Sequence, residues 1–349
     1  MTEYLILAFM STFLAMLAIF LPRSRHIGVI FIWPTIIFAF FMMGFRDETG
    51  GDWVPYLYMY NFVEWYPASV ALTHSDPGYM LANIISSMFG FGVYGTNAIC
   101  GLILSAGIYA LAKRQYVPAL FVASAVPYLI VVVGHGYTRQ AAAIGFMMLA
   151  IASIFDRKRL ISIVYLILAI SFHKTAVAFA PVVLFSIFTG KIASVAITAS
   201  IVPVLYIAYI ANSADSLISA YVEAQMSSAG AAMRLIQVFA CAILYLLFIR
   251  KNEADKIESR LWTSMSLFAL IAFPAALFGP SSTMADRLGL YLLPLQMYVL
   301  ANIGYYTPFK KISQLVGLVV VLINLFLLIY WLNYAVHAVD WLPYQSVLW

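Results

Sequence analysis

Long apolar runs, separated by short polar segments, fill the chain from one end to the other. A helix that crosses the hydrocarbon core of a bilayer needs about 20 consecutive apolar residues, so this pattern predicts an all-α polytopic membrane protein. Single spans are expected at residues 3–21, 27–45, 92–112, 117–133, 138–155, 192–211, 233–250, 260–278, 287–307 and 312–334. Two further apolar stretches, 78–90 and 160–189, do not fit a single span as well.

Basic clusters between the runs indicate how these two stretches fold. Cytoplasmic loops of membrane proteins carry an excess of Lys and Arg. If every cluster is cytoplasmic, the number of crossings between any two clusters is fixed. The clusters are Arg23/Arg25, Lys113/Arg114, Arg157/Lys158/Arg159, Lys191, Arg250/Lys251/Lys256/Arg260 and Lys310/Lys311.

Two crossings are required between Arg159 and Lys191, so residues 160–189 are predicted to form a hairpin whose tip is His173-Lys174. Only one crossing fits between the second span and the Lys113 cluster, so 78–90 is predicted to be a re-entrant or interfacial helix. The result is about twelve spans with both termini outside. Because no soluble domain is apparent, residues 1–349 are interpreted as one integral membrane domain.

Composition agrees with this interpretation and narrows the chemistry. Hydrophobic residues make up 64% of the 349 residues and charged residues 9%, against about 45–50% and about 25% in soluble domains. The net charge of +5 comes largely from the short basic clusters, so it indicates topology and predicts no nucleic-acid partner. Residues 4–21 fit a retained first span better than a cleaved signal peptide. Cys100 and Cys241 lie within apolar runs and indicate neither a disulfide framework nor a metal site.

Five basic residues are isolated, and all of them fall on the predicted external side. Each lies at or near the end of a predicted helix, where the topology rule does not favour a cation. A reason specific to each is therefore expected, and a lipid phosphate held at the membrane would be one. The five residues are Arg46, Arg139, Lys174, Arg234 and Arg287.

Two long loops are expected on the same side, at residues 46–77 and 212–232. The first combines acidic residues with an aromatic run from Trp53 to Tyr60. Aromatic rings with nearby carboxylates suit stacking on sugar rings. Tyr and Trp are, however, also common at membrane interfaces where no ligand binds.

Short motifs at the predicted helix ends follow one another in a distinctive order. They are Arg46 with Gly51-Asp52 and Tyr56, then Asp76-Pro77-Gly78-Tyr79, Arg139-Gln140 before Ala141-Ala142-Ala143, Phe172-His173-Lys174, and Arg287 with Tyr291. In this order the sequence resembles the EpsG-like group of Wzy-type oligosaccharide repeat-unit polymerases, which act in O-antigen and exopolysaccharide biosynthesis. It departs from the group at Asp76, where Glu is expected at least as often, and the 212–232 loop matches no known motif.

The resemblance implies a GT-C-like glycosyltransferase in the bacterial cytoplasmic membrane, with its active site facing outside. Its substrates would be oligosaccharides linked to undecaprenyl or another polyprenyl diphosphate. The growing chain would move from its lipid carrier to the non-reducing end of another lipid-linked repeat unit. The resemblance implies no metal and no other cofactor, and it makes a flippase and a chain-length regulator candidate partners.

This reaction makes two chemical demands on the site. Negative charge grows on the departing lipid diphosphate, and fixed cations stabilise that charge in a water-poor site. Arg139 and Arg287 are the best candidates, because each is predicted to begin a helix, and a helix N-terminus itself attracts anions. The predicted substrate-binding residues are Arg46, Tyr56, Arg139, Gln140, Lys174, Arg287 and Tyr291.

The attacking sugar hydroxyl must also lose a proton to a nearby base. Asp52 is the first candidate, since Gly50-Gly51 before it lets the backbone bend toward a ligand. Asp76 and His173 are the alternatives. Structural roles compete with these functional ones: Asp76 would cap the 78–90 helix, and Arg287 would pair with Asp286 next to it.

Three other functions fit parts of the same pattern. A transporter or flippase of lipid-linked saccharides would place charges near the bilayer midplane and show inverted repeats, whereas these charges gather on one face. A membrane acyltransferase would need a buried His, and His173 keeps that alternative open. A surface-polysaccharide ligase would differ from a polymerase only in its acceptor.

Overall fold

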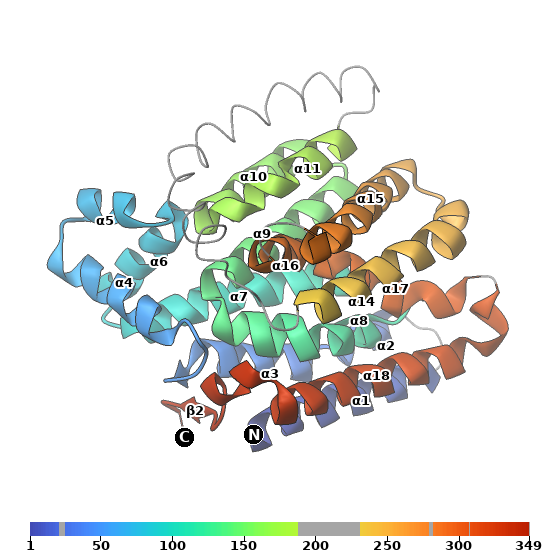
Figure 1. The fold of residues 1–349 in the computed structure, drawn as a ribbon, viewed down its shortest axis with the longest axis horizontal. Helices are drawn as coiled ribbons and strands as arrows, with labels where there is room; N and C mark the ends of the chain where they lie inside the picture. The colour runs from blue at the N-terminus through green and yellow to red at the C-terminus, as the bar shows by residue number, and fades with distance from the viewer. Residues whose placement is uncertain (21–24, 188–230, 279–281, 307, 349) are drawn as a thin grey trace.

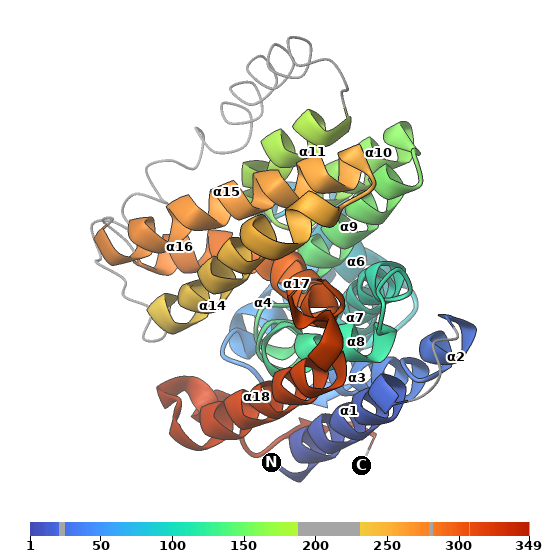
Figure 2. The ribbon, with the colours of Figure 1, turned by 90° about the vertical axis from the view of Figure 1, so that its right-hand side faces the viewer.

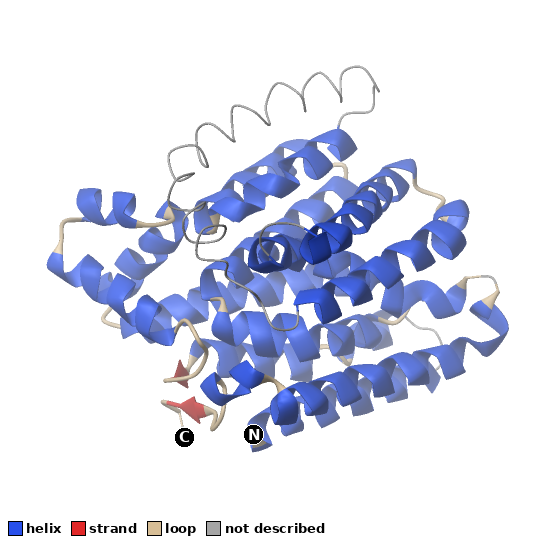
Figure 3. Ribbon diagram, in the orientation of Figure 1, coloured by secondary structure: helices blue, strands red, loops and turns tan. Residues whose placement is uncertain are grey.

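The computed structural model describes residues 1–20, 25–187, 231–278, 282–306 and 308–348. Most of these residues are helical, as the apolar pattern predicts (Figure 3). Within these described ranges, six helices are long and apolar enough to cross a membrane, and four apolar helices are shorter. The predicted span 192–211 and nearly all of the predicted loop 212–232 lie outside the described residues, so the count of about twelve spans stays a prediction.

The first half of the chain forms a layer of helices that ends in the predicted hairpin. These elements are α1 (Thr2–Phe20), α2 (Arg25–Ile30), α3 (Trp33–Gly44), α4 (Trp53–Trp65), α5 (Ala68–His74), α6 (Pro77–Met88), α7 (Gly92–Ala112), α8 (Pro118–Ala125), the π-helix η1 (Val126–Gly134), α9 (Thr138–Phe155), α10 (Arg159–Phe172), the 3-10 helix η2 (Lys174–Phe179) and α11 (Ala180–Ile187).

The described part of the second half packs against that layer (Figure 2). Its elements are α14 (Ala231–Leu244), the π-helix η5 (Tyr245–Ile249), η6 (Arg250–Asn252), α15 (Lys256–Phe278), α16 (Ser282–Gly289), η7 (Leu290–Leu292), α17 (Leu293–Asn302), η8 (Ile303–Tyr305), η9 (Phe309–Ile312), α18 (Ser313–Tyr334) and η10 (Val336–Asp340). Two short strands, β1 (Arg46–Asp47) and β2 (Gln345–Ser346), pair antiparallel and bring the C-terminal segment beside residue 46.

Helix α9 is the centre of the fold. Most of its surface is buried, and it packs along both α7 and α10. Small residues allow the close approach to α7: a side-chain carbon added at Gly107 would lie 2.5 Å from the carbonyl oxygen of Gly145. Close packing through small residues is common where membrane helices meet. The tightly held α9 therefore gives Arg139, in its first turn, a fixed position.

The predicted hairpin is present within the described residues. Helix α10 ends at Phe172, and His173 adopts an extended backbone with φ −155° and ψ 115°. The chain then turns back through η2 into α11, which packs against α10 (Figure 1). The turn at His173-Lys174 thus has the place that the crossing count predicts.

Residues 46–77 are more ordered than the predicted loop. They contain α4 and α5, which gather with α6 at one end of the molecule (Figure 1). Helix α6 corresponds to the predicted short helix at 78–90. The aromatic run between Trp53 and Tyr60 forms part of α4, where Trp53, Tyr56 and Tyr60 point into the protein and are buried. The burial of these side chains therefore stabilises α4 as a helix, although it is too short to span the membrane.

Candidate functional site

Arg139 and Asp76 form the centre of a charged cluster at the end of the molecule that carries α4 to α6. Nη1 of Arg139 donates hydrogen bonds to Oδ2 of Asp76 and to Oγ of Ser75, both at 2.9 Å. The other carboxylate oxygen of Asp76 accepts a hydrogen bond from the backbone N–H of Lys174 at 3.2 Å. Asp76 therefore connects the start of α9 with the tip of the hairpin.

Asp76 does not cap α6 with its side chain, which was the structural role considered for it. Asp76 occupies the N-cap position of α6, yet its side chain makes no capping hydrogen bond there. Only 8% of the Asp76 side chain is exposed. Burial raises the pKa of the Asp76 carboxyl above its usual value, while the charges of Arg139 and Lys174 and the Lys174 N–H act against that rise.

Two buried tyrosine rings flank the Arg139 guanidinium. Its central carbon lies 5.9 Å from the ring centre of Tyr56 and 6.0 Å from that of Tyr79, within the usual range of cation–π contacts. Nε of Arg139 is buried and has no hydrogen-bond acceptor among the described residues. A buried donor without an acceptor is costly, so an anionic oxygen from a ligand would suit this position.

Asp52 joins the same cluster from the turn before α4. Burial raises the pKa of its carboxyl, and the positive charges of Arg287 and Arg139 and a hydrogen bond from the Tyr56 hydroxyl oppose that rise. The turn depends on Gly50, whose φ of +100° is unfavourable for other residues. The position also lacks space, since an added side-chain carbon would lie 2.4 Å from the carbonyl oxygen of His135.

At the hairpin tip, Thr175 connects His173 with Tyr291. The sequence analysis did not single out Thr175. Nδ1 of His173 accepts a hydrogen bond from the backbone N–H of Thr175 at 3.4 Å and lies 3.1 Å from its hydroxyl. The Thr175 hydroxyl also lies 3.1 Å from the Tyr291 hydroxyl. As an acceptor, Nδ1 carries no proton, which leaves Nε2 as the protonated nitrogen of a neutral ring.

Arg287 lies on α16, and its guanidinium carbon is 5.8 Å from the ring centre of Tyr137. Gln140 donates a hydrogen bond of 2.6 Å to the Arg287 backbone carbonyl. Asp286, the neighbour considered as a partner for Arg287, accepts a hydrogen bond of 2.7 Å from Nε of Arg234. Gln140 therefore joins the first turn of α9 to the segment that carries Arg287.

Arg46 lies behind the cluster and has structural contacts. The side chain is almost completely buried, and its donors bind the carbonyl oxygens of Thr49 and Met43 and the hydroxyl of Thr138. Thr138 precedes Arg139, so Arg46 fixes the start of α9. The sequence analysis missed three hydroxyl residues of the site: Ser75, Thr138 and Thr175. Each contacts a residue far away in the sequence, namely Arg139, Arg46 and Tyr291, so no local pattern indicates them.

No cluster of three or more His, Cys, Asp or Glu side chains that could hold a metal ion occurs within the described residues. The acidic members of the site instead face cations: Asp76 binds Arg139, and Asp52 lies within the electrostatic reach of Arg287 and Arg139. This arrangement is suited to binding an anionic group and accepting a proton beside it.

The helices and the buried charges define a multi-pass, predominantly helical membrane protein with a polar site at one end. The chain belongs to the EpsG family, whose family model matches residues 29–346. The match includes every residue of the cluster from Arg46 to Tyr291, and it supports a role like that of polysaccharide polymerases. No curated protein and no solved structure shows significant similarity to the chain.

Proposed function

We propose that the protein is a glycosyltransferase of the external face of the cytoplasmic membrane. It moves a glycan chain from a polyprenyl diphosphate onto another lipid-linked oligosaccharide repeat unit. The observation that carries this proposal is the meeting of Asp52, Asp76, Arg139, His173 and Arg287, which come from separate segments of the chain. Membership of the EpsG family supports the same function.

Arg139 and Arg287 bind the lipid diphosphate. Arg139 has a buried Nε without an acceptor among the described residues, and Asp76 holds its Nη1 so that the guanidinium keeps one orientation. An arginine held in this way presents a planar set of donors to phosphate oxygens. Lys174 and Gln140 support the two arginines from the hairpin tip and from α9.

Asp52 is the base. A hydroxyl oxygen of the acceptor sugar attacks the anomeric carbon of the donor, the bond from that carbon to the diphosphate oxygen breaks, and the hydroxyl proton moves to Asp52. The leaving lipid diphosphate keeps the electron pair of the broken bond. Burial raises the pKa of Asp52, which makes its carboxylate a stronger proton acceptor. Asp76 is occupied by Arg139, so it is a positioning residue, and His173 is the alternative base.

The test uses membranes that contain the full chain and are supplied with lipid-linked repeat units. Arg139→Ala and Arg287→Ala are expected to lower chain growth by about 100-fold or more, the usual scale for losing one group that stabilises transition-state charge. Arg139→Lys is expected to restore part of the activity, because it keeps the charge but not the fork of donors. Polymer length is measured on gels.

Arg250→Ala is the matched control, since Arg250 is an exposed arginine outside the cluster. It should leave chain growth unchanged. Polymer of wild-type length from both Arg139→Ala and Arg287→Ala, at equal protein levels, would contradict the proposed clamp. A strain that lacks the protein should still make single-unit glycans, and the loss of those units would instead favour a flippase.

A further inference from the structure

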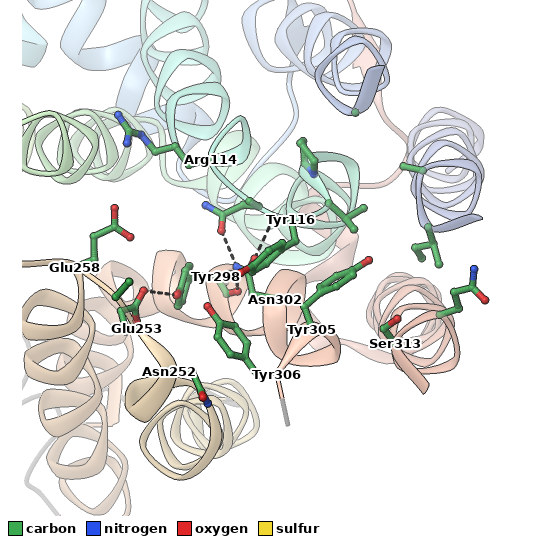
Figure 4. Close-up of a pocket in the computed structure, with 18 of the residues that line it drawn as sticks. Arg114, Tyr116, Asn252, Glu253, Glu258, Tyr298, Asn302, Tyr305, Tyr306 and Ser313 are labelled. Carbon is green, nitrogen blue, oxygen red and sulfur yellow. Dashed lines mark hydrogen bonds between the residues drawn. The ribbon is translucent and has the colours of Figure 1, made fainter. Parts of the chain in front are cut away.

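A second cavity lies at the opposite end of α9 from Arg139. Asp156, directly after α9, forms an ion pair with Arg114, and Arg114 lines the cavity. The cavity has a volume of about 770 Å³, within the range of small-molecule sites. It opens between the ends of α1, α7, α17 and the start of α15 (Figure 4).

Tyrosine rings form one side of this cavity. Tyr116 stacks on Tyr305 with 5.1 Å between ring centres, and Tyr306 meets Tyr116 edge to face at 6.0 Å. Tyr298 lies deeper and donates a hydrogen bond of 2.9 Å to Glu253 (Figure 4). The rings therefore line one side of a space that ends at a carboxylate.

Glu253 is held by neutral donors and not by a cation. Its second carboxylate oxygen accepts a hydrogen bond from the Tyr245 hydroxyl at 3.2 Å. The described residues include no ion pair to Glu253 or to Glu258, which also lines the cavity.

Two arginines near the cavity are ion-paired with aspartates. Arg114 binds Asp156, and Arg157 binds Asp255 at 2.6 Å. Asp255 and Glu258 thus have arginines within electrostatic reach, whereas Glu253 has no basic partner among the described residues. A partly buried charge of this kind is stable when it gains either a proton or a counter-ion.

We propose that this cavity binds a small organic cation, a primary alkylammonium, with Glu253 as its counter-ion and the rings of Tyr116, Tyr305 and Tyr306 around its alkyl part. Aromatic faces and carboxylates together are the usual surroundings of bound ammonium groups. Among the described lining residues the carboxylates of Glu253, Asp255 and Glu258 outnumber the single arginine, Arg114, which disfavours phosphates and other anions. The site is separate from the Arg139 cluster and does not depend on the proposed polymerase function.

The proton and the organic cation compete for Glu253. Burial raises the pKa of the Glu253 carboxyl to about 7; the Tyr298 and Tyr245 hydroxyls oppose the rise, and the nearby charges of Glu258 and Asp255 add to it. Below pH 7 the carboxyl is increasingly protonated and neutral. Affinity for the cation should therefore fall by about tenfold between pH 8 and pH 6, as the charged fraction falls.

The experiment titrates putrescine into the purified full chain in detergent at pH 8 and follows the heat of binding. Saturable binding by the wild type is expected, with an affinity at least about tenfold weaker in Glu253→Gln, since a charge-assisted hydrogen bond is lost. Tyr306→Ala should weaken binding a few-fold through the lost ring. It serves as the second variant if Glu253→Gln does not fold.

Glu64→Gln is the matched control, because Glu64 is an exposed carboxylate at the end of α4. It should bind putrescine like the wild type. Butane-1,4-diol, which has the same length without charge, should not bind. The proposal is overturned if putrescine does not bind at pH 8, if Glu253→Gln and Tyr306→Ala both bind it normally, or if Na⁺ displaces it at equal charge concentration.

Discussion

The two ends of the helical bundle differ in what surrounds a carboxylate that is buried in one case, Asp76, and half-buried in the other, Glu253. At one end Asp76 accepts hydrogen bonds from the Arg139 guanidinium and from the Lys174 N–H. At the other end the Glu253 oxygens accept only tyrosine hydroxyls within the described residues. The first carboxylate is occupied and orients a cation, whereas the second forms no ion pair with any residue that the structure describes. The role of each carboxylate therefore depends on the groups that it contacts, and not only on how far it is buried.

The largest effect should come from removing the charge at the occupied end. Asp76→Asn leaves the partly buried guanidinium of Arg139 without its ion pair, and breaking a buried pair on one side costs about 3–5 kcal/mol. We expect the rate of chain growth in membranes to fall by about 100-fold, with a smaller change in the concentration of repeat unit needed for half the maximal rate.

Ser75→Ala is a matched comparison for that substitution, because Ser75 accepts from the same Nη1 atom at the same 2.9 Å distance but carries no charge. Its loss should cost only about 1 kcal/mol or less. Equal activity losses in Asp76→Asn and Ser75→Ala would show that charge is not what distinguishes this end.

A backbone substitution at the same end should have a smaller effect. Gly50→Ala places a side chain at φ +100° and against the His135 carbonyl, so it should shift the turn that carries Asp52. Strain of this kind costs about 1–3 kcal/mol. We expect a lower midpoint of thermal unfolding and roughly tenfold slower chain growth.

Gly51→Ala is the control for Gly50→Ala. It tests whether any added methyl group in this turn slows chain growth, or only one at Gly50. An added carbon at Gly51 would meet its nearest neighbour, Oδ2 of Asp340, at 3.4 Å, which is an ordinary contact. This variant should behave nearly like the wild type. The same loss in both variants would mean that the Gly50 conformation does not position Asp52.

The smallest effect is expected at Glu253, which has no ion pair among the described residues, and it concerns pH. The pKa of Glu253 in the folded protein, about 7, lies above the ordinary value of 4.5. The folded state therefore binds more protons than the unfolded state between these values, and stability falls as the pH rises from 5 to 7.5. In Glu253→Gln this contribution is absent, so its midpoint of thermal unfolding should depend less on pH. An unchanged pH dependence would place a counter-ion beside Glu253.

The sequence by itself determined the long apolar helices of the described residues, the turn at His173-Lys174 and most of the residues in the charged cluster. Long apolar runs fix the helices because bilayer thickness sets their length, and basic clusters fix where the chain turns. The motifs from Arg46 to Tyr291 also determined the family. These properties depend on local sequence or on the number of membrane crossings between basic clusters.

Only the tertiary structure decided how the charged groups pair. Asp76 has the sequence context of a helix cap, yet its side chain binds Arg139; Arg46 has acids beside it, yet it binds carbonyls and Thr138. Residues 46–77 were expected to form a loop, and packing makes them helices. The Glu253 cavity gave no sequence signal. Pairing depends on distances between segments far apart in the chain, and those distances follow from the packing of α9 with its neighbours.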